Sequence, residues 1–97
     1  MSLNRLQTSY LRGLAHPLSA AVSIGASGLT DAVMSELEST LKYHELLKIR
    51  IATDNRDLRK KLIQDICSST SAELVQQIGK VAVIFRPSKK NKIKLPA

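Results

Sequence analysis

The stretch IGASGLT, residues 24–30, joins two segments of different character. The run AAVSI at residues 20–24 reads as a strand, and the amphipathic run that starts near Thr30 reads as a helix. Gly25 and Gly28 enclose two small residues, so few side-chain atoms separate this backbone from a ligand. The N-terminus of the following helix adds unpaired N–H groups and a partial positive charge. The stretch therefore predicts a strand-to-helix turn able to seat a phosphate, although two glycines at this spacing are more often simple turn residues.

Outward from this turn, hydrophobic periodicity and the positions of caps, glycines and prolines predict three helices and four strands. Helices are expected over residues 4–15 and 30–43, with a third that is capped within 53–55 and ends near 68; strands are expected over 20–24, 46–52, 73–78 and 81–86. Strand–helix–strand units cross right-handed, which gives parallel neighbours, and Gly79-Lys80 closes an antiparallel hairpin. The order helix-strand-helix-strand-helix-strand-strand predicts a compact α/β fold, in which a four-stranded mixed sheet carries at least two helices on one face.

Each helix has an apolar stripe that is expected to face the core. The stripes are Leu3, Leu6, Tyr10 and Leu14 in the first helix, Val33, Met34, Leu37 and Leu41 in the second, and Leu58, Leu62, Ile63 and Ile66 in the third. In the strand at 46–52, apolar residues at 47, 49 and 51 alternate with Lys48 and Arg50. This alternation predicts one buried face and one cationic face.

Length and composition indicate one domain. Of the 97 residues, 43% are hydrophobic, which is ordinary for a globular chain. We expect a single domain over residues 1–88 and a mobile basic tail over residues 89–97. No apolar run reaches the length of a membrane span and the N-terminus shows no signal-peptide pattern, so we expect a cytoplasmic protein. The single cysteine, Cys67, fits a reducing compartment and a structural role.

The positive charge is concentrated in the second half of the chain. The formal net charge is +7; residues 46–97 carry twelve basic and four acidic side chains, whereas residues 1–45 carry three and four. Such asymmetry favours a polyanionic partner, and nucleic acid above all. The alternative is a solvated surface that keeps the protein soluble.

No constellation of catalytic or metal-binding residues is visible. The candidates His16, His44 and Cys67 are isolated and lack zinc-site spacing. No serine lies in a nucleophile elbow, and no pair of carboxylates is placed for acid–base work. The glycine turn lacks the lysine and hydroxyl of a nucleotide P-loop. We therefore expect no catalytic residue, no metal, no cofactor and no small-molecule substrate.

Nucleic-acid binding is the function that the residues favour. Backbone N–H groups of the glycine turn would position phosphates, and basic side chains would supply the salt-dependent affinity. The chain has only three aromatic residues, Tyr10, Tyr43 and Phe85, which argues for recognition of the backbone and shape of structured RNA rather than base stacking. Asp31, just after the turn, opposes phosphate binding there. The predicted contacts are Gly25, Ala26, Ser27, Gly28, Lys48, Arg50, Arg56, Lys60, Lys61, Lys80, Arg86, Lys89 and Lys90.

Several motifs, in order, resemble one family. They are LAHPL (14–18), IGASGLT (24–30), HELLKI (44–49), and QIGKV (77–81) with FRP (85–87). Together they resemble the CRM domain, named for chloroplast RNA splicing and ribosome maturation, in its bacterial stand-alone, YhbY-type form. The resemblance covers about residues 11–90. It implies a fold similar to the C-terminal domain of bacterial translation initiation factor three, and it places the family's Gly-x-x-Gly loop at residues 25–28.

The resemblance also implies RNA binding without catalysis and association with precursors of the large ribosomal subunit. The first hypothesis is therefore a monomeric, non-enzymatic protein that binds ribosomal RNA and assists assembly of that subunit. The alternative is a protein-interaction module that docks its basic surface on an acidic protein. An RNA-processing enzyme is the weakest of the three.

Overall fold

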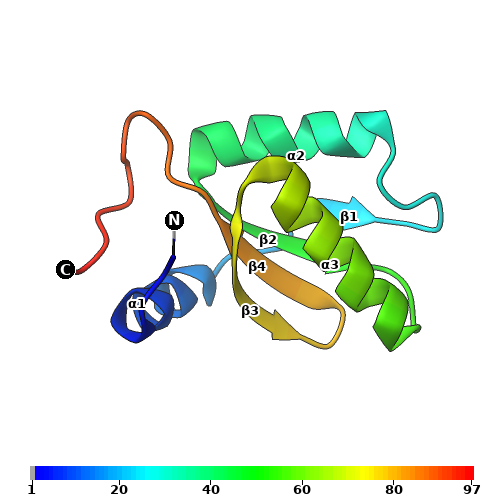
Figure 1. Cartoon of the computed structure of the whole chain (residues 1–97), viewed down its shortest axis with the longest axis horizontal. Helices are drawn as coiled ribbons and strands as arrows, with labels where there is room; N and C mark the ends of the chain where they lie inside the picture. The colour runs from blue at the N-terminus through cyan, green and yellow to red at the C-terminus, as the bar shows by residue number, and fades with distance from the viewer. Residues whose placement is uncertain (1) are drawn as a thin grey trace.

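Three helices and four strands follow one another in the predicted order in this computed structural model, which describes residues 2–97. Their bounds are α1 (Arg5–Ala15), β1 (Val22–Ile24), α2 (Asp31–His44), β2 (Leu46–Ile51), α3 (Arg56–Thr70), β3 (Glu73–Ile78) and β4 (Val81–Phe85). The sheet has the order β1-β2-β4-β3 (Figure 1). β1 is parallel to β2, and β4 is antiparallel to both β2 and β3, so the predicted four-stranded mixed sheet is confirmed.

Helices lie on both faces of the sheet. α2 and α3 pack on one face, where Ile24, Leu37 and Ile66 belong to the larger core. α1 lies on the other face, over a smaller core that contains Leu11 and Phe85 (Figure 1). Because β4 is inside the sheet and buried on both sides, its residues form a continuous apolar run rather than an alternating one.

The face that α1 buries differs from the predicted one. Leu11 and Ala15 are buried, whereas Leu6 is 58% exposed and Tyr10 and Leu14 are also exposed. The helix is thus rotated by about a third of a turn from its expected stripe. Apolar residues spread around much of α1, so periodicity alone left the buried side undetermined. Contacts with the sheet and the C-terminal segment decided it.

The other two helices agree more closely with prediction. The α2 stripe faces the larger core, and the Val33 N–H donates to the predicted capping hydroxyl of Thr30 at 3.2 Å. In α3, Ile63 and Ile66 are buried as expected, but Leu58 is 45% exposed. Leu58 lies in the first turn of α3, ahead of the residues that contact the core, so the stripe was predicted one turn too long.

The C-terminal segment is held against the domain, contrary to the prediction of a mobile tail. Glu45 is fully buried, and its carboxylate accepts hydrogen bonds from the Ser88 hydroxyl and from the backbone N–H groups of Ser88, Lys92 and Ile93. Ile93 and Leu95 pack on the smaller core beside α1. Burial opposes ionisation, but these hydrogen bonds prevail and lower the pKa of Glu45 to about 2. A buried carboxylate at the end of α2 therefore fixes a segment whose composition suggested mobility.

Candidate nucleic-acid interface

The predicted glycine turn is an exposed, tight connection between β1 and α2. The Gly28 N–H donates to the Gly25 carbonyl at 3.0 Å, which closes the turn. Gly28 has φ +68°, a left-handed conformation that disfavours a Cβ, whereas a Cβ on Gly25 would meet no atom within 4 Å. The backbone conformation therefore favours glycine at position 28 but not at position 25. Close approach of a ligand backbone would account for glycine at position 25.

This difference between the two glycines predicts two different stabilities. Gly28→Ala should lower the free energy of unfolding by about 1–2 kcal/mol, because alanine is strained at positive φ. Gly25→Ala should leave it unchanged or raise it by about 0.5 kcal/mol, because alanine restricts the unfolded chain. Urea denaturation of both variants measures this. Equal losses would contradict the backbone geometry described for the turn.

Three connections meet at the end of the sheet where the glycine turn lies (Figure 1). The Ala52 N–H donates to the Ile24 carbonyl at 2.9 Å, which holds the β2–α3 connection beside the turn. The Ile51 N–H donates to the Lys80 carbonyl at 2.7 Å, which holds the β3–β4 hairpin beside β2. Parts of the chain about fifty residues apart in sequence thus form one continuous edge.

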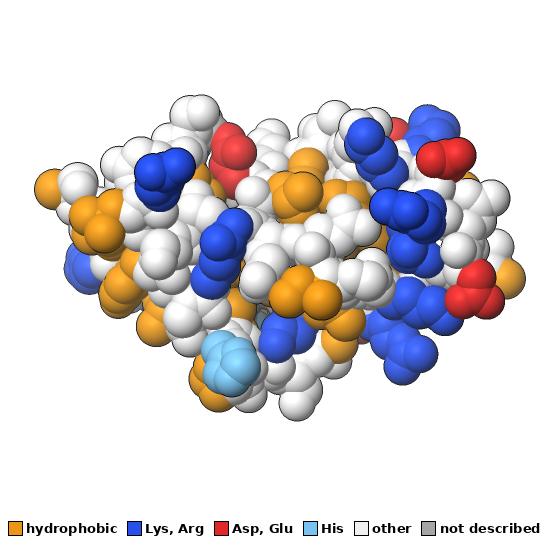
Figure 2. Space-filling view, turned by 90° about the horizontal axis from the view of Figure 1, so that it is seen from below, with side chains coloured by type: hydrophobic (Ala, Val, Ile, Leu, Met, Phe, Trp, Pro, Cys, Tyr) orange, Lys and Arg blue, Asp and Glu red, His pale blue; other side chains and the backbone are white. Residues whose placement is uncertain are grey.

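Four of the predicted basic contacts lie at or near this edge. Arg50 is exposed near the end of β2, Lys80 is in the hairpin turn, and Arg56 and Lys60 are on the first turns of α3. Lys80 Nζ is 2.7 Å from a carboxylate oxygen of Asp54. The hydrogen bond and charge of Lys80 lower the pKa of Asp54, so this lysine is already partly neutralised. Figure 2 shows basic side chains gathered over this end of the molecule, with a few acidic ones among them.

The cationic face of β2 is only partly open. Lys48 is half-buried, and its Nζ donates to the Leu18 carbonyl at 2.8 Å. Arg50 is exposed and has no ion pair within residues 2–97. Of the two predicted strand cations, Arg50 is therefore the more accessible to a phosphate.

Three of the remaining predicted contacts, Arg86, Lys89 and Lys90, lie away from this edge. Arg86 is only 22% exposed on its side chain; its Nη1 donates to Glu38 and to the Thr70 carbonyl, both at 2.9 Å, and so links β4 to the two helices above it. Lys89 and Lys90 follow the end of β4, at the opposite end of the sheet from the glycine turn (Figure 1). Lys61 lies on α3, with its Nζ 3.4 Å from Asp65.

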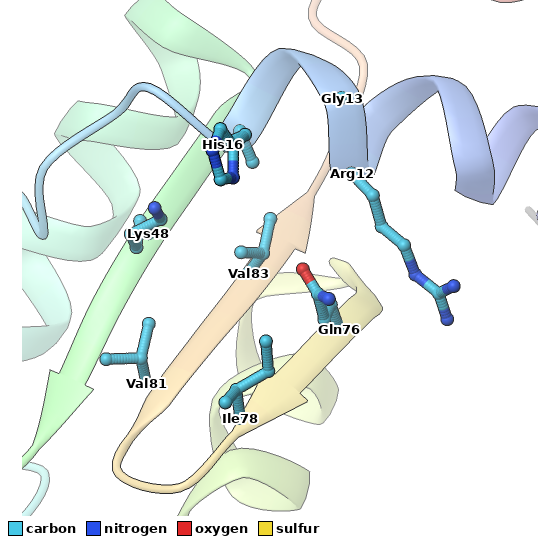
Figure 3. Close-up of a pocket in the computed structure, with 9 residues that line it drawn as sticks. Arg12, Gly13, His16, Lys48, Gln76, Ile78, Val81 and Val83 are labelled. Carbon is cyan, nitrogen blue, oxygen red and sulfur yellow. The ribbon is translucent and has the colours of Figure 1, made fainter.

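Sequence reasoning missed three residues, Arg12, His16 and Arg59, that the tertiary structure places beside predicted contacts. Arg59 of α3 donates to the Thr53 carbonyl at 2.8 Å, and its buried Nε has no partner among the described residues. Arg12 and His16, at the end of α1, lie beside Lys48 and Gln76 (Figure 3). Their side chains come from three separated elements, so no local motif could have revealed them.

Within residues 2–97, no group of three or more histidine, cysteine, aspartate and glutamate side chains is placed to hold a metal ion. None of the helices described is long and apolar enough to span a bilayer. Burial raises the pKa of the Cys67 thiol, and the charge of Glu73 adds to this, so Cys67 is held in its less reactive form.

Comparison with known proteins gives a consistent result. The CRS1 / YhbY (CRM) domain family model matches residues 3–86. An "RNA-binding protein" of Haemophilus influenzae is 41% identical over 98% of this chain and 96% of its own, and "Probable RNA-binding protein PA4753" of Pseudomonas aeruginosa is 36% identical over 93% and 86%. The solution structure of the hypothetical protein SAV1595 from Staphylococcus aureus, 38% identical, superposes with a TM-score of 0.84 over 98% of this chain and 100% of that one.

Proposed function

The chain belongs to the CRS1 / YhbY (CRM) domain family, and from this premise we propose that it binds structured RNA without catalysing a reaction. The RNA is ribosomal RNA in precursors of the large ribosomal subunit, and the protein assists their assembly as a cytoplasmic monomer. The ribosomal part of the proposal rests on the resemblance of its motifs to the bacterial stand-alone form of the family.

One observation carries the RNA-binding proposal. The exposed glycine turn at residues 25–28 lies at the same end of the sheet as Arg50, Lys80 and Arg56. Backbone N–H groups in a side-chain-free turn can hold phosphates by shape, while nearby cations supply affinity. Relatives that match nearly the whole chain are named RNA-binding proteins, which supports RNA as the ligand.

The glycine turn and the nearby cations have different roles in binding RNA. The turn positions a phosphate against the backbone, because Gly25, Ala26 and Ser27 are exposed and carry little side chain. Arg50 and Arg56 then contact neighbouring phosphates from β2 and α3. Asp31, exposed at the first position of α2, disfavours a phosphate directly over the helix axis. The backbone of the RNA is therefore expected to pass on the sheet side of the turn.

A salt series tests this function. Affinity would be measured for a structured fragment of large-subunit ribosomal RNA and for duplex DNA with the same number of phosphates. With three or four phosphates engaged, log affinity should fall by about 3 for each tenfold rise in salt concentration. RNA should also bind at least tenfold more tightly than DNA.

Two results would count against RNA as the partner. Equal affinity for DNA and RNA would show that the +7 charge acts without selectivity. Weak binding of both at physiological salt would favour the alternative, in which the basic surface docks on an acidic protein. Because both nucleic acids carry the same charge, the comparison separates recognition of shape from general attraction.

A further inference from the structure

The part of the sheet that α1 leaves uncovered forms a groove of about 360 Å³. Figure 3 shows it between the end of α1 and strands β2, β4 and β3. Its lining includes His16, Lys48, Gln76, Ile78, Val81 and Val83. The glycine turn is not part of this groove, and the RNA contacts proposed above do not include it.

The floor of the groove is apolar and comes from adjacent strands. Val83 pairs with Lys48 on one side and Gln76 on the other, and Val81 pairs in the same way with Arg50 and Ile78. Ile78 is 67% exposed, although it lies in a strand and next to a valine. An aliphatic surface left open in the middle of a polar face is a feature of binding sites.

The rim of the groove is polar and cationic. Lys48 and Arg12 supply positive charge, His16 supplies ring nitrogens, and the Gln76 amide both donates and accepts hydrogen bonds (Figure 3). No carboxylate is among the residues that line it within the described chain. The groove therefore offers a flat apolar floor, one amide able to read hydrogen-bonding groups, and cations at the edge.

We propose that this groove binds one unpaired nucleotide of the RNA. Its base lies on the apolar floor, and the phosphates beside it are held by the cationic rim. The proposal rests on the RNA-binding function proposed above. A glutamine amide can pair with the edge of a base, and an aliphatic floor can cover its ring. Bases in an A-form helix are stacked and hidden, whereas an unpaired base in a bulge or loop can be splayed into a pocket. The volume falls within the range of small-ligand sites, about 300–1,000 Å³.

The position of the groove fits a continuous path for the RNA. Arg50 pairs with Val81 of the groove floor on one side and with Ser23 of β1 on the other. Ser23 is two residues before Gly25. A strand whose phosphate sits at the glycine turn can thus cross Arg50 and place a neighbouring nucleotide at the groove.

Two RNA hairpins closed by the same stable loop test the proposal, one with a fully paired stem and one whose stem carries a single extra, unpaired nucleotide. The protein should bind the second about fivefold to tenfold more tightly, because only that hairpin has an unpaired base in its stem. Gln76→Ala and Ile78→Ser should each remove most of this preference while leaving affinity for the paired hairpin within about twofold. Both side chains reach the surface of β3, so the fold should tolerate their loss.

Gln77→Ala is the matched control, because Gln77 follows Gln76 on β3 but pairs with Ala82 on the opposite face of the sheet. It should keep the full preference for the unpaired nucleotide. Equal binding of the two hairpins by the unmodified protein would overturn the groove proposal while leaving RNA binding intact. Loss of the preference in Gln77→Ala as in Gln76→Ala would also overturn it. Failure to bind either hairpin would remove the proposed function itself.

Discussion

Replacing Glu45 with alanine is expected to lower the free energy of unfolding by about 3 kcal/mol. The carboxylate is fully buried and accepts hydrogen bonds from Ser88, Lys92 and Ile93. Alanine would leave these N–H groups without their acceptor and would release the apolar contacts of Ile93 on the smaller core. Urea denaturation measures the loss. Glu36→Ala, at an exposed position of α2, is the control and should change stability by less than about 0.5 kcal/mol.

The same carboxylate should make stability depend on pH. The folded-state pKa of Glu45, about 2, lies below its ordinary value of 4.5. Its contribution is therefore complete above pH 4.5 and is lost as the pH falls towards 2. Glu45→Gln keeps the side-chain size but cannot ionise, so the stability difference between the two proteins should shrink over this range. A stability difference that stays constant from pH 6 to pH 2.5 would contradict an ionised Glu45 carboxylate in the folded protein.

Arg50→Glu is expected to weaken RNA binding roughly tenfold at about 0.1 M salt and to make the salt slope shallower by about 1. Arg50 is exposed, has no ion pair within the described chain, and lies between the glycine turn and the groove. Reversing its charge removes one phosphate contact and repels another. Filter binding or fluorescence anisotropy over a salt series measures both effects.

Lys42→Glu makes the same change in net charge and is the control for this experiment. Lys42 is in the last turn of α2, one helix length of about 20 Å from the glycine turn at its start. It should weaken binding by no more than about twofold, through general charge alone. Equal effects of the two variants would show that affinity follows total charge and not the edge where Arg50 lies.

The candidate interface was only partly visible before the fold was known. The glycine turn and Arg50 were predicted because a local motif and a strand alternation mark them. Arg86 was predicted with them because it is basic, yet it is engaged with Glu38 and Thr70 inside the fold. Charge in the sequence shows that a surface is basic, but it does not show which cations already have partners.

The sequence by itself determined the order of the elements, the mixed sheet and the position of the glycine turn. These follow from hydrophobic period, capping residues and turn chemistry, all of which act within a few residues. Only the tertiary structure decided which side of α1 is buried, where the C-terminal segment lies and which strands form the groove. The donors to Glu45 are 43 to 48 residues away in sequence, and the groove is built from paired residues of three strands, β2, β4 and β3. Such contacts depend on how whole elements pack, and local propensity carries no information about them.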